Sequence, residues 1–588
     1  MTIGDSLTGE QRPLHTWPVT VERGAPLFPR PDWWSPARLG ALDIEDHLCL
    51  VGRRGIAERD VRIRLFVYAV AVFVVCLTAS CTSGAASVES TSGSVAPSQG
   101  SSTAGSVSSA VFSSGPCPQP KSPGAPAPDL GPTAACGSLT VPEDRRNPTG
   151  RTVRLAVARV PAVTAAGQSD PIVYLEGGPG VSMMSLASRA IKAGVNADRD
   201  VIFVEQRGTL FSEPNLVCPE VEAFMAASVS EHFSAPTTGV KSDAATTACR
   251  DRLTASGVDL KAYTTAENAA DVADLRVAMG IKEWNVYGTS YGTDLAQRLL
   301  RDHPAGIRSV VLDSVVASNL NPIEQFWPSF ATAYQAMFGA CAAQPACAAA
   351  YPDLAGELTR SVNRLTTSPL VVTVPDANGK PTPVNVDGYR FANLVGVVLA
   401  GGPSSAALVP KLIHQMATGD GAFVAAAVVS TTVLTPGLNA DGFTWSAACP
   451  DWTAGTTRAA VLAKAKAALP DFPDVVLSLL PQVSRFQSDC AIWDVGTSPA
   501  SARAAVVSDV PVLLLGGTFD GVTAIYWQDA VKPGLSKGQS VSFPGLGHTV
   551  VDQSPCAMSV MQAFLAAPGT TVDQSCAARM TIPPFTTS

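Results

Sequence analysis

Short apolar runs alternate with helical patterns along the middle of this chain. The apolar runs predict buried strands at 171–175, 201–204, 284–287 and 309–312. Apolar residues at helical spacing predict helices at 267–279 and directly after Ser290. Because strands and helices alternate, the pattern predicts an α/β fold with a mostly parallel sheet covered on both faces.

Further patterns flank this region. Strand signals at 137–142 and 152–160 are separated by a polar, turn-rich segment and predict a hairpin. From 321 to 505 alanine-rich helical tracts dominate, with one hairpin around Asn378-Gly379. Strand signals return at 511–515 and 539–543, before a closing helix at 558–565. We therefore expect an α/β core at 134–320 and 506–588, interrupted by a largely helical cap at 321–505.

The first 133 residues have a different composition. An apolar run, Leu65–Ser80, follows five arginines and has the order of a secretory signal. It ends Leu-Thr-Ala-Ser-Cys, which resembles a bacterial lipobox, so residues 61–81 are the expected signal and Cys81 the expected lipidation site. A plain signal peptide or an anchor helix is the alternative. Residues 82–133, rich in Ser, Gly and Pro, predict a tether.

Residues 1–60 do not fit a leader that starts a chain. They form a loop-like tract with Pro-Arg-Pro and Trp-Trp sequences. Our hypothesis is that translation naturally begins downstream, at Val51 or Val61. The expected product is anchored by lipid to the outer face of the plasma membrane, or secreted.

The cysteine count agrees with export. Of 13 cysteines, Cys49, Cys76 and Cys81 lie in the leader. The remaining ten are an even number, as expected for an oxidised exported domain. Sequence neighbours suggest five pairs, although the sequence leaves the pairing open: Cys117–Cys136, Cys218–Cys249, Cys341–Cys347, Cys449–Cys490 and Cys556–Cys576.

Composition also excludes some partners. The net charge is −8, the charged fraction is 15%, and the body of the chain has no basic run, which argues against nucleic acid. No C-x-x-C and no Cys/His cluster indicates a metal site, and we expect no cofactor.

A candidate nucleophile lies between the strand 284–287 and the helix that follows. Gly288-Thr289-Ser290-Tyr291-Gly292 is a G-x-S-x-G, the sharp turn that exposes a serine above a sheet. Its glycines prevent collision with the adjacent strand and helix. A second match, 534–538, follows Lys532-Pro533 instead of an apolar strand, and we interpret it as a polar turn.

A serine hydroxyl needs a base to take its proton, and the base needs an acid to orient it. In chains with this turn the acid and then the histidine follow the serine. His303 lies at a helix end and His414 in the cap, so both are expected to be structural. His548 follows a strand in a glycine-rich loop and is the predicted base.

Asp520 follows the strand at 511–515 and is the predicted acid, with Asp313 as the alternative. The structural interpretation of Asp520 is a helix cap bonded to the N–H of Thr523. Two groups of backbone N–H donors are expected to bind an oxyanion. One is Tyr291, and the other is Gly177-Gly178, after the strand 171–175.

Five motifs, in order, carry a resemblance: EGGPG at 176–180, EQRG at 205–208, GTSYGT at 288–293, FDGVT at 519–523 and GLGH at 545–548. They resemble the proline-iminopeptidase-type branch of the α/β-hydrolases. More closely, the chain resembles the actinobacterial tripeptidyl aminopeptidase (TAP) family of exported serine peptidases, from about Cys136 to Cys576. The resemblance implies an α/β-hydrolase fold, peptide substrates with free N-termini, and a triad of Ser290, Asp520 and His548.

Two departures leave the specificity open. Glu176 stands where prolyl iminopeptidases usually have His, and Glu205 replaces the Asp of a longer motif whose last residues also differ. A cationic amine would pair with a carboxylate near the acyl pocket. Glu176, Glu205 and cap acids such as Asp451 are candidates, with structural or solvated roles as the alternative.

We therefore expect an exopeptidase that releases di- or tripeptides through an acyl-enzyme. The alternative is a carboxylesterase that uses the same triad on short acyl esters. A non-catalytic envelope binding protein is disfavoured by the complete set of Ser, Asp and His.

Overall fold

The computed structural model describes residues 110–164, 168–376 and 379–587. The predicted signal, Cys81, residues 1–60 and most of the tether lie outside these residues. In the described ranges, no helix combines the length and apolarity that crossing a bilayer requires.

One sheet of nine strands forms the core, in the order β1-β2-β3-β5-β4-β6-β7-β10-β11. All neighbours from β5 to β11 are parallel, and β1, β2 and β3 are an antiparallel edge. The predicted α/β fold is thus confirmed. The strands are β1 (Val111–Ser114), β2 (Ala135–Pro142), β3 (Thr152–Val160), β4 (Gln168–Leu175), β5 (Arg199–Val204), β6 (Trp284–Thr289), β7 (Ile307–Asp313), β10 (Val512–Gly517) and β11 (Gly538–Phe543).

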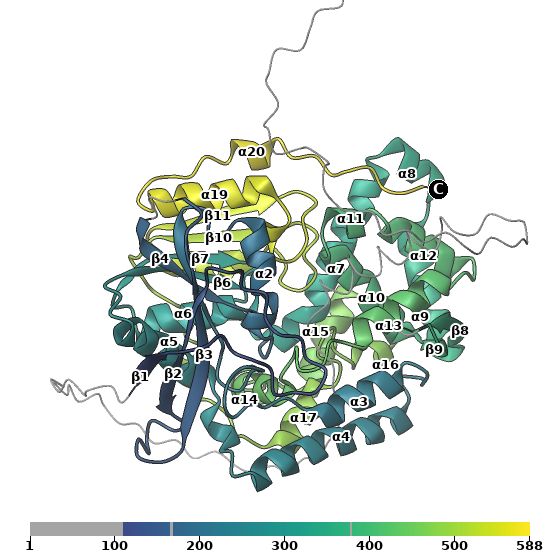
Figure 1. Ribbon diagram of the computed structural model, residues 1–588. Coiled ribbons are helices and arrows are strands. Elements are labelled where there is room, and N and C mark those ends of the chain that lie inside the picture. Colours follow the sequence, from purple (N-terminus) through teal and green to yellow (C-terminus); the bar gives the residue numbers. More distant parts are fainter. Residues whose placement is uncertain (1–109, 165–167, 377–378, 588) are drawn as a thin grey trace, which may run out of the picture. The chain divides into compact units, whose positions relative to one another are not determined.

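Helices cover both faces of this sheet, and its central strands β4, β6, β7 and β10 are accordingly buried along almost their whole length. Figure 1 shows α19 (Pro555–Ala566) on one side of the strands and α5 (Thr265–Ala278) and α6 (Tyr291–Asp302) on the other. In parallel sheets, sites form where the carboxyl ends of the strands meet. The loops after β4, β6, β10 and β11 carry all the predicted catalytic residues.

The tether prediction was wrong at its end. Val111–Ser114 form β1, which pairs with β2 so that Phe112 lies opposite Leu139. Without β1, the backbone groups of β2 would be an open sheet edge. The disulfide between Cys117 and Cys136 then ties the following segment to the domain. The globular unit therefore includes residues from 110, and does not begin near 134.

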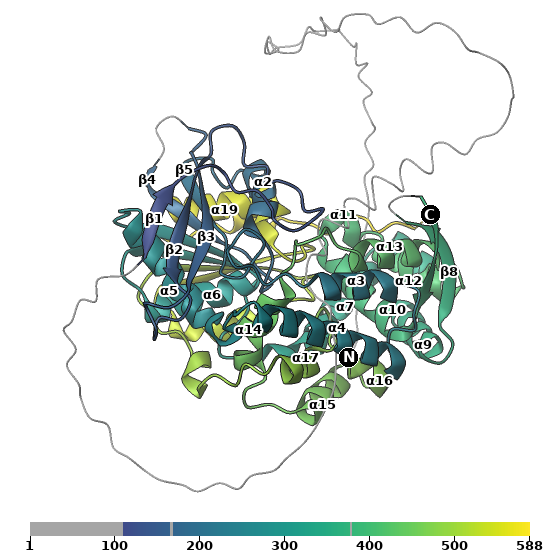
Figure 2. The same ribbon diagram turned by 60° about the horizontal axis from the view of Figure 1, so that its bottom comes forward.

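The cap boundary was also incomplete. Helices α3 (Pro219–Ser228) and α4 (Pro236–Ala255), which the sequence interpretation left inside the core, pack with cap elements. The N–H of Ser234 donates to the Asp387 carboxylate over 2.7 Å, and Arg390 donates to the carbonyl of Ser228 over 2.6 Å. The cap is therefore made from two insertions, and Figure 2 shows α3 and α4 beside the helices of the larger one.

The larger insertion is mainly helical, as predicted. Its hairpin, β8 (Leu370–Pro375) with β9 (Pro381–Val386), is antiparallel. Its helices are α7 (Pro322–Ala342), α8 (Pro345–Ala350), α9 (Leu354–Thr367), α10 (Gly388–Ala400), α11 (Pro403–Ala406), α12 (Val409–Ala417), α13 (Ala422–Thr432), α14 (Asp441–Trp452), α15 (Arg458–Ala468), α16 (Asp474–Leu477) and α17 (Phe486–Trp493).

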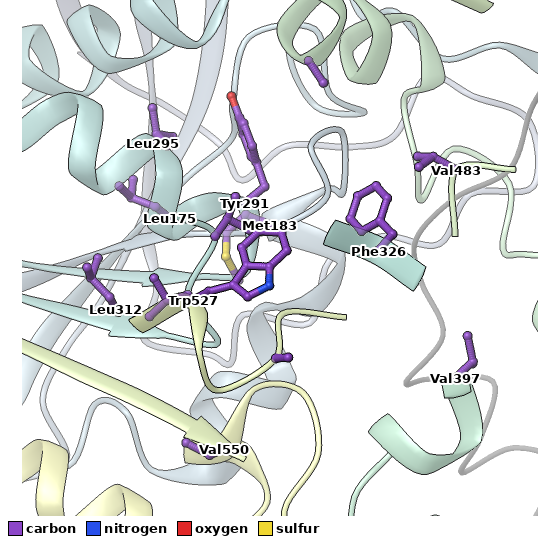
Figure 3. Packing of buried hydrophobic residues seen from close by; sticks show 14 of the residues in the cluster. Leu175, Met183, Tyr291, Leu295, Leu312, Phe326, Val397, Val483, Trp527 and Val550 are labelled. Atoms are coloured by element: carbon purple, nitrogen blue, oxygen red, sulfur yellow. The ribbon is translucent and has the colours of Figure 1, made fainter. Parts of the chain in front are cut away.

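Core and cap share one hydrophobic cluster. Figure 3 shows Tyr291 and Trp527 close together near the strand ends, with Phe326 of α7 on the cap side. The indole N–H of Trp527, in α18 (Trp527–Val531), donates to Ser329 of α7 over 3.0 Å. Shared burial of this kind fixes the cap over the carboxyl ends of the strands.

All five suggested disulfide pairs are confirmed: Cys117–Cys136, Cys218–Cys249, Cys341–Cys347, Cys449–Cys490 and Cys556–Cys576. Each pair closes a short loop of the sequence, the longest separation being 41 residues. Each bridge therefore restrains one local segment of the chain.

Candidate active site

Ser290 occupies a strained turn between β6 and α6. Its φ of 53° and ψ of −126° are values that residues with a Cβ rarely adopt. A Cβ on Gly288 would lie 2.3 Å from the carbonyl oxygen of Gly292, and one on Gly292 would lie 2.0 Å from that of Leu175. Both glycines are therefore needed for this turn to form. The other G-x-S-x-G places Ser536 in an exposed turn before β11, as predicted.

His548 and Asp520 meet at the ends of β11 and β10. His548 Nδ1 lies 2.9 Å from Asp520 Oδ2, and the Asp520 side chain is fully buried. Asp520 also accepts hydrogen bonds from the backbone N–H groups of Val522 and Thr523 and from the Thr523 hydroxyl. The carboxylate thus orients the imidazole and caps a turn at once. The capped segment is not a helix, since α18 begins at Trp527.

Asp313, the alternative acid, joins the serine turn to the histidine loop. Its carbonyl oxygen accepts from the N–H of Ser290 over 3.0 Å. Its carboxylate accepts from the N–H groups of Val550 and Val551 over 2.9 and 3.0 Å. Burial raises the pKa of Asp313 to about 6. This geometry makes Asp313 a support for both loops and leaves the imidazole contact to Asp520.

Within the residues that the structure describes, no hydrogen bond joins the Ser290 hydroxyl to the His548 ring. Catalytic hydrogen bonds of this type often tighten only when substrate is bound.

The expected oxyanion turn lies against the serine. A Cβ on Gly177 would lie 2.8 Å from the Cβ of Ser290. The N–H of Gly177 donates to Glu176 Oε1 over 2.8 Å, so this predicted donor is already engaged. Gly178 is partly exposed at a φ of 113°, and Tyr291 is the first residue of α6. Gly178 and Tyr291 are therefore the better donors for an anion.

The EQRG motif at 205–208, which follows β5, stabilises the oxyanion turn through hydrogen bonds. The Gln206 side chain donates to the carbonyl of Glu176 over 2.7 Å and accepts from Asn268 over 2.9 Å. Arg207 is fully buried and forms a two-point ion pair with Asp271, with two bonds of 2.7 Å. Sequence reasoning assigned these residues no role, although the motif itself was recognised.

Glu205 does not fit the amine-binding hypothesis. It is fully buried, and its carboxylate accepts from the N–H groups of Met184 and Phe211 over 3.1 and 3.2 Å. Burial raises its pKa. A carboxylate so enclosed has a structural role, because binding an ammonium group would require the surrounding loops to open.

Glu176 and Asp451 are also largely enclosed. Glu176 Oε1 accepts from the Thr289 hydroxyl over 3.2 Å as well as from Gly177. Asp451 lies 3.5 Å from Arg298 and is buried. Neither geometry places a carboxylate with two free oxygens next to Ser290.

The two other histidines that follow Ser290, His303 and His414, make structural contacts. His303 ends α6, with its N–H bonded to the carbonyl of Leu299. His414 in α12 lies 2.9 Å from Glu357 and packs against the ring of Tyr351. In the described ranges no cluster of His, Cys, Asp and Glu has the geometry of a metal site.

Family comparisons cover both halves of this site. A family described as "alpha/beta hydrolase fold" matches residues 170–394, which include the oxyanion turn and Ser290. A family described as "TAP-like protein" matches residues 481–576, which include Asp520 and His548. The chain belongs to the TAP-like α/β-hydrolases. In this TAP-like hydrolase the two matched segments also include both ends of the cap insertion and leave residues 395–480 between them.

Individual relatives have different named activities. The chain is 31% identical over 196 residues to a tripeptidyl aminopeptidase of Streptomyces lividans, covering 31% of this chain and 35% of that protein. It is 26% identical over 200 residues to the serine protease Hip1 of Mycobacterium tuberculosis, covering 32% and 38%. It is 32% identical over 228 residues to carboxylesterase B of the same species, covering 37% and 43%. The chain thus spans roughly a third to two fifths of these relatives.

The cap contacts the oxyanion turn of this TAP-like hydrolase through α14. The N–H of Ala440 donates to the carbonyl of Gly180 over 2.9 Å. The Thr444 hydroxyl donates to the carbonyl of Pro179. Asp441, the first residue of α14, accepts from Asn439 over 2.8 Å. Burial raises the pKa of Asp441 to about 8, so this acid is neutral at pH 7.

We expect this proton to make stability depend on pH. The native carboxyl keeps its proton up to about pH 8, whereas the unfolded one releases it near pH 4. The native state therefore binds more protons, and the free energy of unfolding falls as pH rises between these values. This one group accounts for a fall of about 3–4 kcal/mol between pH 5 and pH 8, which Asp441→Asn should remove. Urea unfolding at both pH values measures it, with exposed Asp471→Asn as control. An unchanged slope contradicts the prediction.

Proposed function

We propose that this chain is an exported serine peptidase that releases short units, di- or tripeptides, from free peptide N-termini through an acyl-enzyme. The observation that carries the proposal is the Asp520–His548 pair at the strand ends, in the same site region as a strained serine turn. The relationship to a tripeptidyl aminopeptidase supports the choice of substrate.

In the proposed reaction, His548 Nε2 takes the proton of the Ser290 hydroxyl as its oxygen attacks the scissile carbonyl. Asp520 holds the Nδ1 proton and stabilises the imidazolium that forms. The N–H groups of Gly178 and Tyr291 bind the developing oxyanion. His548 then gives the proton to the leaving amine. In the second half, it activates the water that releases the peptide acid.

A substrate panel tests this proposal. We expect the full-length protein to cleave tripeptide amides with a free N-terminus, and the N-blocked amides far more slowly. Ser290→Ala should lower kcat by about 10⁴-fold or more, because the nucleophile is lost. Ser536→Ala, in the second G-x-S-x-G, is the matched control and should retain full activity. Equal cleavage of free and blocked peptides would remove N-terminal recognition from the proposal.

The second candidate is a carboxylesterase, favoured by the relationship to carboxylesterase B. The same triad would act on a short acyl ester, and the departing alcohol would take the proton from His548. Cleavage of esters without cleavage of any peptide amide would select this alternative.

We also propose that the protein is lipid-anchored through Cys81 at the outer face of the plasma membrane, or else secreted. Five disulfides within the domain support an oxidising location. Cys81→Ala should move the protein from the detergent phase to the aqueous phase on Triton X-114 partition, and mass spectrometry should show the loss of the lipid. Unchanged partition and mass would contradict the anchor.

A further inference from the structure

A small polar cavity adjoins the turn that carries the predicted catalytic histidine, His548. Its volume is about 20 Å³, and it is lined by Tyr174, Glu176, Arg189, Thr549 and Asp552 together with two apolar side chains. Glu176 directly precedes the oxyanion glycines, and Thr549 directly follows His548. The cavity therefore lies between the two turns whose separation matters most for the proposed reaction.

Arg189, from α2 (Met183–Ala193), bonds to the histidine turn at two points. Its Nη2 donates to the Thr549 hydroxyl oxygen and to Asp552 Oδ2, both over 2.7 Å. The Thr549 hydroxyl in turn donates to the carbonyl of His548 over 2.6 Å. Thr549 has a φ of 65°, which a β-branched residue adopts only when neighbouring groups enforce it. The guanidinium is such a group.

One acceptor in the cavity has no donor from the protein. The side chain of Asp552 is 6% exposed, and in the described residues its Oδ1 has no hydrogen-bond partner. Such an atom needs a partner, because an unpaired buried acceptor costs about 1–3 kcal/mol. The cavity is large enough for one water molecule, and Tyr174, Glu176 and Asp552 offer it polar partners.

The charges in this cluster depend on one another. Burial raises the pKa of Glu176, the nearby Arg189 lowers it, and Asp552 raises it. Arg189 is thus a cation that opposes the effect of burial on the Glu176 carboxyl group. Removing Arg189 would raise the pKa of Glu176 further and so weaken the hydrogen bond that the Gly177 N–H donates to this carboxylate.

We propose that Arg189 is a positioning residue for the catalytic histidine. With Asp552 and a single water molecule in the cavity, it holds the His548–Thr549 turn at a set distance from the oxyanion turn. It touches neither the substrate nor the reacting atoms. The inference rests on the proposed serine hydrolase function but not on the choice between peptide and ester.

The test measures the rate at which a fluorophosphonate probe labels Ser290, and kcat and KM on whichever substrate the panel identifies. Arg189→Ala should lower the labelling rate and kcat by about 30–100-fold, as for other groups that orient a catalytic ligand, with KM changed less than threefold. Arg189→Lys should recover part of the loss. Arg159→Ala, which removes a surface ion pair with Asp200, is the matched control. It should change neither the labelling rate nor kcat.

Methylguanidine at millimolar concentration should restore labelling of Arg189→Ala, because it can occupy the vacated space, and should not affect the wild type. A labelling rate for Arg189→Ala within threefold of wild type overturns the inference. The inference is also overturned if the loss of labelling is proportional to the fraction of unfolded protein and methylguanidine does not restore it. If Arg189→Ala does not fold, Arg189→Lys and Asp552→Asn carry the same test. A wild type that does not react with the probe contradicts the proposed function itself.

Discussion

Asp520→Asn is expected to lower kcat by about 10³–10⁴-fold with little loss of folded protein. The amide oxygen still accepts from the N–H groups of Val522 and Thr523, so the turn survives. The imidazole, however, loses the anion that fixes its tautomer and stabilises its charged form. Steady-state kinetics on the best substrate, with thermal unfolding as a check on folding, measure this effect.

Asp313→Asn is the matched comparison for this prediction. Its amide oxygen can still accept from the backbone after β11, and its main-chain carbonyl still binds the N–H of Ser290. We expect a fall of about tenfold in kcat, as for a residue that acts through its neighbours. If Asp313→Asn is the more severe variant, the acid of the triad has been assigned to the wrong strand.

Arg207→Met is expected to destabilise the fold by about 3–5 kcal/mol, the usual effect of removing one partner of a buried ion pair. Arg207 is fully buried and bonds the Asp271 carboxylate at two points and the carbonyls of Glu143 and Ala262. All these acceptors lose a donor in the variant. Arg145 still contacts Asp271, which favours the lower end of the range.

Urea unfolding measures the effect of Arg207→Met. Arg146→Met is the control, because Arg146 is exposed and pairs with Asp144 on the surface, and no measurable change is expected there. Equal stability of the two variants would show that the buried network contributes nothing beyond packing. Activity should fall as well, since Gln206, next in the chain, bonds the strand end before the oxyanion turn.

Local patterns were enough for the core strands and for the serine turn. The parallel strands, most of which contain a short apolar run, lie within a few residues of their predicted bounds. Context also separated the two serine motifs, because only Ser290 follows an apolar strand. The disulfide pairs could also be predicted locally, because each bridge joins two cysteines that are consecutive among the ten of the domain.

Elements without such a pattern were missed. β1 lies in a Ser-rich stretch and exists because β2 offers it an unpaired edge. Helices α3 and α4 have weak amphipathic patterns, and they join the cap through contacts such as that of Ser234 with Asp387. In both cases the partner lies far along the chain, where no local window includes it.

By itself, the sequence determined the order of strands and helices, the turn that presents Ser290, and the candidates for base and acid, because each depends on residues adjacent in the chain. Only the tertiary structure decided that Asp520 contacts His548 while Asp313 supports both loops, that Glu205 is enclosed, and that Arg189 reaches Thr549. These facts depend on distances between loops from different strands, which packing of the sheet, helices and cap sets.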